Sequence, residues 1–234
     1  MDVSVVIPTL NEAAGIAGAV GSVAGEASQV IVADGGSTDG TRAAARALGA
    51  EVLRAPRGRG AQMDCGARAA KAEVLLFLHA DTRLAPGWKA AVESALSDRR
   101  VVAGGFSLAI DSPRRWFRVV EAAVSLRSRF NLLYGDQAIF ARRAVFVEAG
   151  GFGGLPLMED VDCMRRLARR GRIALLAERA VTSPRRWEER GLYRATLRNW
   201  LYLAMYYAGV SPKTLYRLYY GGERYLRESA DRLP

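Results

Sequence analysis

The first half of the chain alternates short apolar runs with longer alanine-rich segments of helical spacing. The apolar runs are β-branched or leucine-rich and cover residues 3–7, 30–33, 51–53 and 74–78. The alanine-rich segments cover residues 12–23, 38–48 and 59–71. Strands that alternate with helices of this length form a mostly parallel sheet with helices on both faces. The sequence therefore predicts an α/β fold.

Polar residues follow three of these predicted strands. Pro8 and Thr9 follow the first strand, Asp34 follows the second, and Asp81 lies shortly after the run that ends at residue 78. Ligands of open α/β sheets bind beyond the carboxyl ends of the strands. Core packing alone does not account for polar groups at three strand ends, so this edge of the sheet is predicted to bind a ligand.

The second half of the chain is less regular. Strands are predicted over residues 101–110, 137–140 and 173–176, and helices over residues 113–130, 142–149 and 161–170, with two more between residues 192 and 220. There is no internal repeat and no low-complexity linker. We therefore predict one domain over residues 1–190 and a helical C-terminal extension over residues 191–234.

Arginine dominates the charge of the chain. Its 234 residues carry 34 Lys and Arg against 24 Asp and Glu, a net charge of +10, and only residues 71, 89 and 213 are lysines. Arginine forks suit phosphate groups, although an arginine-rich composition can also reflect genome bias. The charge favours an anionic partner, and a nucleotide diphosphate, a membrane surface and a nucleic acid all meet that description.

Cysteine usage and hydropathy indicate the compartment. The two cysteines are far apart in sequence and form no CxxC pattern, and no signal peptide precedes the first strand, so a cytoplasmic location is predicted. The longest uncharged apolar stretch, residues 199–212, is shorter than the ~20 residues that cross a bilayer. No transmembrane helix is expected, while contact with the inner face of a membrane stays open.

Several motifs in a fixed order resemble one enzyme family. They read VVIPTLNE, DGGSTDGT, LHADT, YGDQAIF, a GGF loop followed by MEDVD, and SPRRW. This order is similar to that of family 2 glycosyltransferases, whose GT-A fold is Rossmann-like. The segments LHADT, YGDQ and RRWEERG resemble those of a bacterial branch described as the arsenosugar-biosynthesis type. The resemblance covers residues 3–190, and its strength lies in the order, because no single motif is specific.

The resemblance implies a divalent cation, Mg²⁺ or Mn²⁺, bound at Asp81. In this family a DxD motif places its metal-binding aspartate at that position, and the cation neutralises the leaving diphosphate. Here the motif reads His79-Ala80-Asp81, so the only histidine of the chain replaces the first acid. His79 is expected to contact the nucleotide sugar or the metal, and capping a turn is its structural alternative.

The resemblance also implies a general base. Asp160 stands at the position of the family's catalytic carboxylate, and Glu159 is the neighbour that orients it or contacts the acceptor. A carboxylate at the start of a helix suits the removal of an acceptor proton. The alternative is that these acids only complement the dipole of the following helix.

Residues around the first two strands are expected to hold the nucleotide. By resemblance, Pro8, Thr9, Leu10 and Glu12 border the base and ribose, and Asp34 contacts the base. The family's second acid after this strand is missing, because the chain reads Asp34-Gly35, and the base is left open. In the PRGRGAQ segment, Arg57 and Arg59 are expected near the diphosphate, or in solvent.

The acceptor is expected on the other side of the site. By resemblance, Asp136 and Gln137 floor the acceptor pocket, although a structural turn explains them almost as well. Arg186 and Trp187 resemble a signature of processive members, in which the arginine pairs with diphosphate and the tryptophan stacks on the acceptor. A buried tryptophan anchor is the alternative. Polymer synthesis is disfavoured, because processive members of this kind carry transmembrane helices.

These expectations combine into one predicted function with two rivals. The chain is predicted to be a metal-dependent inverting glycosyltransferase that transfers a sugar from a nucleotide-diphosphate sugar to a hydroxyl of a small-molecule acceptor. The first rival transfers to a polyprenyl phosphate at the membrane surface, and the second is a non-catalytic anion-binding or nucleic-acid-binding protein. We expect no nucleic-acid partner.

The arginines and aromatics of residues 114–130 and 200–220 suit either a membrane surface or packing onto the domain or a second subunit. Packing is the favoured interpretation of the two.

Overall fold

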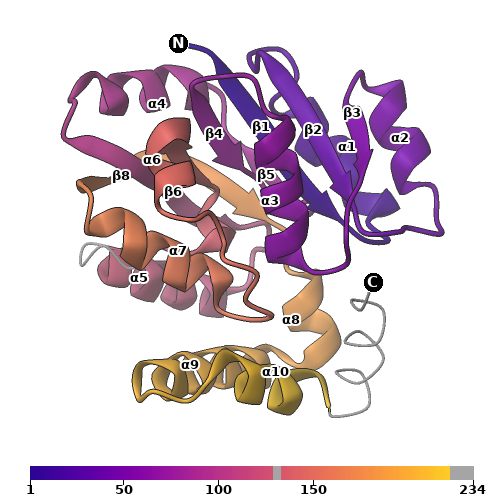
Figure 1. Cartoon of the computed structure of the whole chain (residues 1–234). Coiled ribbons are helices and arrows are strands. Elements are labelled where there is room, and N and C mark those ends of the chain that lie inside the picture. The colour runs from indigo at the N-terminus through magenta and orange to yellow at the C-terminus, as the bar shows by residue number, and fades with distance from the viewer. Residues whose placement is uncertain (129–132, 222–234) are drawn as a thin grey trace.

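The centre of the molecule is a β-sheet with helices on both faces (Figure 1). In the computed structural model, which describes residues 1–128 and 133–221, the sheet has eight strands in the order β3-β2-β1-β4-β7-β6-β8-β5. The first four of these strands are parallel to one another. The predicted α/β class with a mostly parallel sheet is confirmed.

The parallel part of the sheet comes from the first third of the chain. Its strands are β1 (Val3–Thr9), β2 (Gln29–Asp34), β3 (Glu51–Arg54) and β4 (Val74–Phe77). The connecting helices are α1 (Ala13–Gly21), α2 (Thr41–Ala47) and α3 (Arg59–Ala69). The central strands β1 and β4 are buried along their whole length, as parallel strands between two helix layers must be, whereas the edge strand β3 is partly exposed.

Strand β1 lies between two hydrophobic cores. Val5 and Ile7 face the core that contains Trp88, whereas Val6 faces the core that contains Met63. This alternation follows from the two-residue period of a strand. On the second face helix α3 approaches β1 so closely that a Cβ atom added at Gly66 would lie 2.3 Å from Val6 Cγ1.

The second half adds antiparallel pairs to the sheet. Strand β7 (Ile139–Arg142) runs antiparallel to β4 and to β6 (Val101–Ile110), and β8 (Arg172–Thr182) runs parallel to β6. Strand β5 (Thr82–Leu84) pairs with the end of β8 at the sheet edge. No pattern in the sequence predicts so short a strand. Helix α4 (Trp88–Ser97), also unpredicted, packs over the first core.

The strand predicted at residues 137–140 differs in the structure. A 3-10 helix covers Gly135–Gln137, and the strand begins two residues later, at Ile139. Between them Ala138 adopts a φ of 48°, a left-handed conformation that breaks the extended backbone. Helices α6 (Arg143–Glu148) and α7 (Glu159–Ala168) then cover the second core.

The last helices gather at one end of the molecule, at the bottom of Figure 1. Helix α5 (Arg115–Ser128) packs on β6 in a third apolar cluster that also contacts Trp187 and Leu192. Helix α8 (Arg185–Arg190) leads into α9 (Leu192–Tyr207), beside which α10 (Pro212–Tyr220) lies. None of the helices within the described residues has the length and apolar character that spanning a membrane requires. Phe130 at the end of the predicted basic helix, and residues 222–234 of the predicted extension, lie outside the described residues.

Candidate active site

The carboxyl ends of β1, β2 and β4 meet at one edge of the sheet. Thr9 and Asp34 are register partners at the ends of β1 and β2, and the chain after β4 leads through His79 to Asp81. Chain segments that are far apart in sequence therefore deliver polar groups to one place, as the parallel topology requires.

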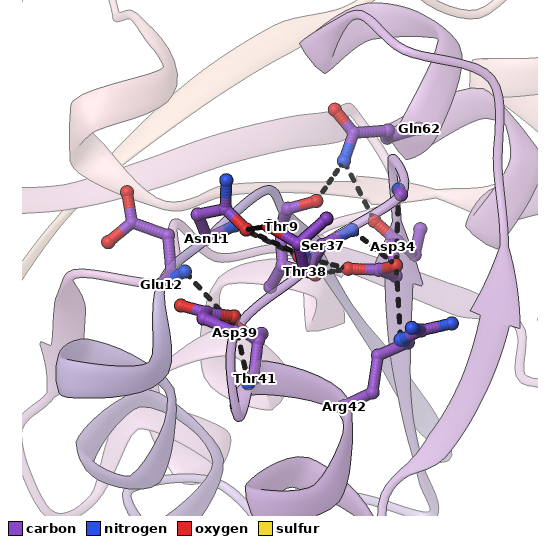
Figure 2. A network of polar contacts seen from close by, with 12 residues as sticks. Thr9, Asn11, Glu12, Asp34, Ser37, Thr38, Asp39, Thr41, Arg42 and Gln62 are labelled. Atoms are coloured by element: carbon purple, nitrogen blue, oxygen red, sulfur yellow. Dashed lines mark hydrogen bonds and ion pairs between the residues drawn. The ribbon is translucent and has the colours of Figure 1, made fainter.

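Asp34 organises the loop that follows β2 (Figure 2). Its carboxylate is buried and accepts hydrogen bonds from the backbone N–H of Gly36 at 3.1 Å and of Ser37 at 3.0 Å. The hydroxyl of Ser37 donates to it as well, and that of Thr9 lies 3.4 Å away. Through these contacts the Asp34 carboxylate stabilises the turn after β2.

A second set of contacts joins the loops after β1 and β2 (Figure 2). Asn11, at a positive φ of 55°, accepts from the Thr38 N–H at 2.9 Å and donates its own N–H to Ser37 Oγ at 2.9 Å. The N–H of Glu12 donates to Thr41 Oγ1 at 2.9 Å. The loop that carries Leu10 and Glu12 is thus held against α2.

Gln62 of α3 connects the ends of β1 and β2. Its amide group donates to the carbonyl oxygens of Thr9 and of Ala33, the latter at 3.0 Å (Figure 2).

Asp39 accepts from the N–H of Thr41 at 3.0 Å and from that of Ala13 at 3.1 Å, so that it stabilises the starts of helices α2 and α1. Hydrogen bonds from Thr41 lower the pKa of the Asp39 carboxyl.

Asp81 lies beside the basic start of α8. Its carboxylate is 3.4 Å from Arg186 Nε, and a second nitrogen of Arg186 is 3.6 Å from the carboxylate of Glu12. Arg185 pairs with the other oxygen of Glu12. The SPRRW segment therefore closes one wall of the site by ion pairs with the loops after β1 and β4.

Glu159 and Asp160 occupy the first turn of α7. Met158, which precedes them, adopts a φ of 62°, an uncommon conformation for a residue with a side chain. Both acids are buried, and both pair with Arg59, which forms a hydrogen bond with Glu159 and lies 3.6 Å from Asp160 Oδ2. The two carboxylates and one guanidinium form a compact charged cluster.

Asp160 is held in its ionised form. Burial alone would raise its pKa, but Arg59 and the N–H groups of Gly135 and Val161, each 2.8 Å from the carboxylate, outweigh burial and lower it. An ionised carboxylate is the state that can accept a proton. Asp160 is therefore an ionised carboxylate in the first turn of α7.

His79 and Asp160 converge on Gly135. A Cβ atom added at Gly135 would lie 2.9 Å from Asp160 Oδ2 and 3.0 Å from His79 Nε2. Within the described part of the chain Nε2 is buried without a hydrogen-bond partner. Burial and the charge of Arg59 lower the pKa of His79 to about 4, although Asp81 opposes this shift. The imidazole is therefore neutral near pH 7.

Gln137 and Asp136 differ in their surroundings. The amide of Gln137 is buried and donates to the Phe106 carbonyl at 3.1 Å and to Ser128 Oγ at 2.9 Å, which are structural contacts. Asp136 faces the site and lies 3.9 Å from Arg127, and burial raises its pKa.

A cavity of about 460 Å³ connects these groups. Among the described residues it is bordered by most of the side chains that the sequence indicated, but Asp34 and Gln137 are not among its lining residues. The sequence-indicated residues that line the cavity are Pro8, Thr9, Leu10, Glu12, Arg57, Arg59, His79, Asp81, Asp136, Glu159, Asp160, Arg186 and Trp187.

Other lining residues were not expected from the sequence. Tyr134 and Arg127 line the cavity together, with the guanidinium 3.8 Å from the ring centroid. Tyr134 belongs to the YGDQ motif and could have been found there, whereas Arg127 looks like any surface arginine of a basic helix. Aromatic residues of α9 and α10 also reach the cavity, including Tyr202 and Tyr216.

The donor atoms at Asp81 suit a cation that is shared with a ligand. Within the described residues, no three His, Cys, Asp or Glu side chains come together to hold a metal by themselves. Mg²⁺ normally keeps several waters and binds one or two carboxylates together with phosphate oxygens. One carboxylate beside a cavity rich in arginine fits such a cation, with His79 Nε2 as a further nearby donor atom.

Known proteins resemble the chain in sequence and fold. Residues 4–154 match the family model of glycosyl transferase family 2. Glucosyl-3-phosphoglycerate synthase from Mycobacterium tuberculosis, solved with Mn²⁺, UDP and glucosyl-3-phosphoglycerate, is 22% identical with a TM-score of 0.54, over 78% of this chain and 70% of its own. No curated protein matches the chain significantly.

A second structural neighbour is TarS of S. aureus. Its residues 1–349 are 18% identical to the chain with a TM-score of 0.62, over 92% of this chain and 69% of its own. The complex of the same protein with UDP-GlcNAc gives 18% identity and a TM-score of 0.60, over 78% and 58%. At these identities the neighbours establish a shared fold.

Proposed function

Because the chain belongs to glycosyl transferase family 2, we propose that it transfers a sugar from a nucleotide-diphosphate sugar to an acceptor hydroxyl, with a divalent metal and with inversion at the anomeric carbon. The glycosyltransferase assignment and the GT-A fold follow from the family. The observation that carries the finer proposal is that Asp81 and the ionised Asp160 line one cavity.

In the proposed reaction Asp160 acts on the acceptor hydroxyl. The acceptor oxygen attacks the anomeric carbon while the bond from that carbon to the diphosphate oxygen breaks, and the electron pair leaves with the nucleoside diphosphate. Asp160 takes the acceptor proton, a role supported by its ionised state and its position at the cavity wall. Glu159 and Arg59 keep Asp160 in place.

The leaving diphosphate needs positive charge. Asp81 would hold Mg²⁺ or Mn²⁺, and the bound cation supplies Lewis-acid stabilisation of the departing phosphate oxygen. Arg59 and Arg186 line the same cavity and supply fixed positive charge nearby. Pro8, Thr9, Leu10 and Glu12 border the part of the cavity where we place the nucleoside. UDP-sugars are the first donors to test, because both structural neighbours were solved with UDP compounds.

Binding of a nucleotide diphosphate tests the metal and donor parts of this proposal. We expect UDP or another nucleoside diphosphate to bind in isothermal titration calorimetry, with a Kd at least tenfold lower when Mn²⁺ is present. Asp81→Ala should remove that metal effect. Asp111→Ala is the control, because Asp111 is exposed and pairs with Arg83 outside the cavity. Equal metal dependence in the two variants would refute Asp81 as a metal ligand.

A further inference from the structure

The cavity has two ends of different chemistry. Within the part of the chain that the structure describes, five acidic side chains line the cavity, and all of them, from Glu12 to Asp160, belong to the polar end described above. The other end lies among α5, α8, α9 and α10, and none of the described residues that line it is acidic. We call it the apolar chamber, and its principal residues are Val124, Trp187, Trp200, Tyr202, Leu203 and Tyr216.

The walls of the apolar chamber are already packed. Tyr202 and Tyr216 are buried, and the ring of Tyr202 contacts that of Tyr219 edge to face at 5.4 Å. Trp187 is fixed in the same way against Phe117, at 5.9 Å. Sites for small molecules are mostly apolar and largely formed in advance, with a few polar groups that set orientation. The chamber has this character.

Cations stand at the border of the apolar chamber. Arg198 lies over the ring of Tyr219 at 4.5 Å, and within the described residues its Nε is buried without a hydrogen-bond partner. Arg127, which lies over the ring of Tyr134, also lines the cavity. An acidic group on a ligand in the apolar chamber would therefore lie next to a guanidinium group.

The apolar chamber is continuous with the surface. Trp200 lines the chamber and is also 49% exposed. On the outer face of α9 it joins Tyr193, Leu197 and Leu201, which are also exposed and recur at helical spacing. Residues 191–220 contain four basic residues and no acidic one. An apolar stripe among cations attracts anionic amphiphiles.

We propose that the acceptor is an amphiphile, whose hydroxyl reaches Asp160 while its apolar body occupies the apolar chamber. The inference rests on the proposed function, because it names the acceptor class of the same transfer. An acceptor without an apolar body would leave the aromatic wall of α9 and α10 unused. The exposed face of α9 gives such a molecule a path from the surface.

Calorimetric titrations of the full chain with two phosphates test this inference. Dodecyl phosphate, used below its micelle concentration, has an apolar body, whereas glycerol 3-phosphate has the same charged group without one. We expect dodecyl phosphate to bind at least tenfold more tightly. Equal affinity for the two compounds would overturn the inference.

Substitution of Trp200 locates the binding site. Trp200→Glu should weaken binding of dodecyl phosphate at least tenfold, whereas Leu218→Glu should leave it unchanged, because Leu218 is similarly exposed, at 57%, and does not line the cavity. Trp200→Ser provides a milder change if the glutamate variant does not fold. Equal affinity in the Trp200 and Leu218 variants would exclude the apolar chamber as the site.

Nucleotide binding, measured on the same preparations, separates the two proposals. If UDP and Mn²⁺ bind while dodecyl phosphate does not, the acceptor inference fails and the donor proposal stands. If neither binds, the proposed function fails.

Vesicles distinguish two sources of the amphiphile. Cosedimentation with vesicles of phosphatidylcholine and phosphatidylglycerol, absent with phosphatidylcholine alone and lost in Leu197→Glu, would identify a lipid acceptor. Binding of free dodecyl phosphate without vesicle binding would identify a soluble one. Both results support an amphiphilic acceptor.

Discussion

At the scale of single residues, His79 is the most unusual group of the site. Burial and the nearby Arg59 lower its pKa to about 4 from an ordinary value of 6.5. Because it is the only histidine of the chain, its imidazole signals can be followed by NMR without assignment. We expect these signals to stay unchanged from pH 8 to about pH 5 and to shift near pH 4.

The lowered pKa of His79 also makes the free energy of unfolding depend on pH. Between about pH 6.5 and pH 4 the unfolded chain binds a proton at His79 that the folded chain does not, so the free energy of unfolding should fall as the pH is lowered through this range. His79→Asn should reduce the slope of that fall, measured by urea denaturation. A histidine titration near 6.5 in the folded protein would contradict both expectations.

Gly135 tests the positions of His79 and Asp160 together. An added Cβ would crowd both side chains at about 3 Å, and the backbone there is not in the left-handed region, so Gly135→Ala should disturb the site more than the fold. We expect turnover to fall on the order of 100-fold, because small displacements of reacting groups cost this much. The rate of sugar transfer or of donor hydrolysis measures it. An unchanged rate would show that this spacing is not critical.

The sequence indicated many of the residues around the cavity but not the directions of their side chains. Asp81 and Asp160 were identified by family motifs, and both line the cavity. Asp34 was expected to contact the base, yet its oxygens bind the turn after β2. Which hydrogen-bond donors an aspartate carboxylate contacts depends on the backbone conformation of its own loop. Residue type alone does not determine that conformation.

At the scale of elements, contact between α3 and β1 depends on a glycine. Gly66→Ala would place a methyl group 2.3 Å from Val6, inside the second core, and overpacking of this kind costs about 1–3 kcal/mol. Gly21→Ala is the matched control, because Gly21 is also helical and a Cβ atom added there would meet none of the described residues within 4 Å. Urea denaturation should show destabilisation for Gly66→Ala and a small gain or no change for Gly21→Ala. Equal effects would mean that the contact is not tight.

Elements with a strong periodic pattern were predictable, and short or tertiary-dependent ones were not. The β-branched runs of β1 and β2 formed strands, and the alanine-rich segments that follow them formed helices α1 and α2. Strand β5 has only three residues and exists because β8 pairs with it. The start of β7 was misplaced because the 3-10 turn before it is stabilised by contacts of Gln137 with β6 and α5, which lie elsewhere in the chain.

At the scale of the whole molecule, the cavity joins the two halves of the chain. The first half supplies the strand ends around Thr9 and Asp81, and the second half supplies Asp160, Arg186 and the aromatic wall. Positive and negative side chains alternate at its polar end, where Arg59 pairs with Asp160 and Arg186 with Asp81. The net charge of +10 therefore does not describe the site, in which acids and arginines are paired.

The most direct test of the central claim is the turnover of Asp160→Asn. If Asp160 is the general base, the variant should transfer sugar roughly 100-fold to 10,000-fold more slowly while it still binds nucleoside diphosphate with Mn²⁺. Asp162→Asn is the control, because Asp162 is a first-turn acid of the same helix, pairs with Arg166 and does not line the cavity. A turnover of Asp160→Asn equal to that of Asp162→Asn would mean that both acids only stabilise the helix, and would contradict the proposed catalytic role.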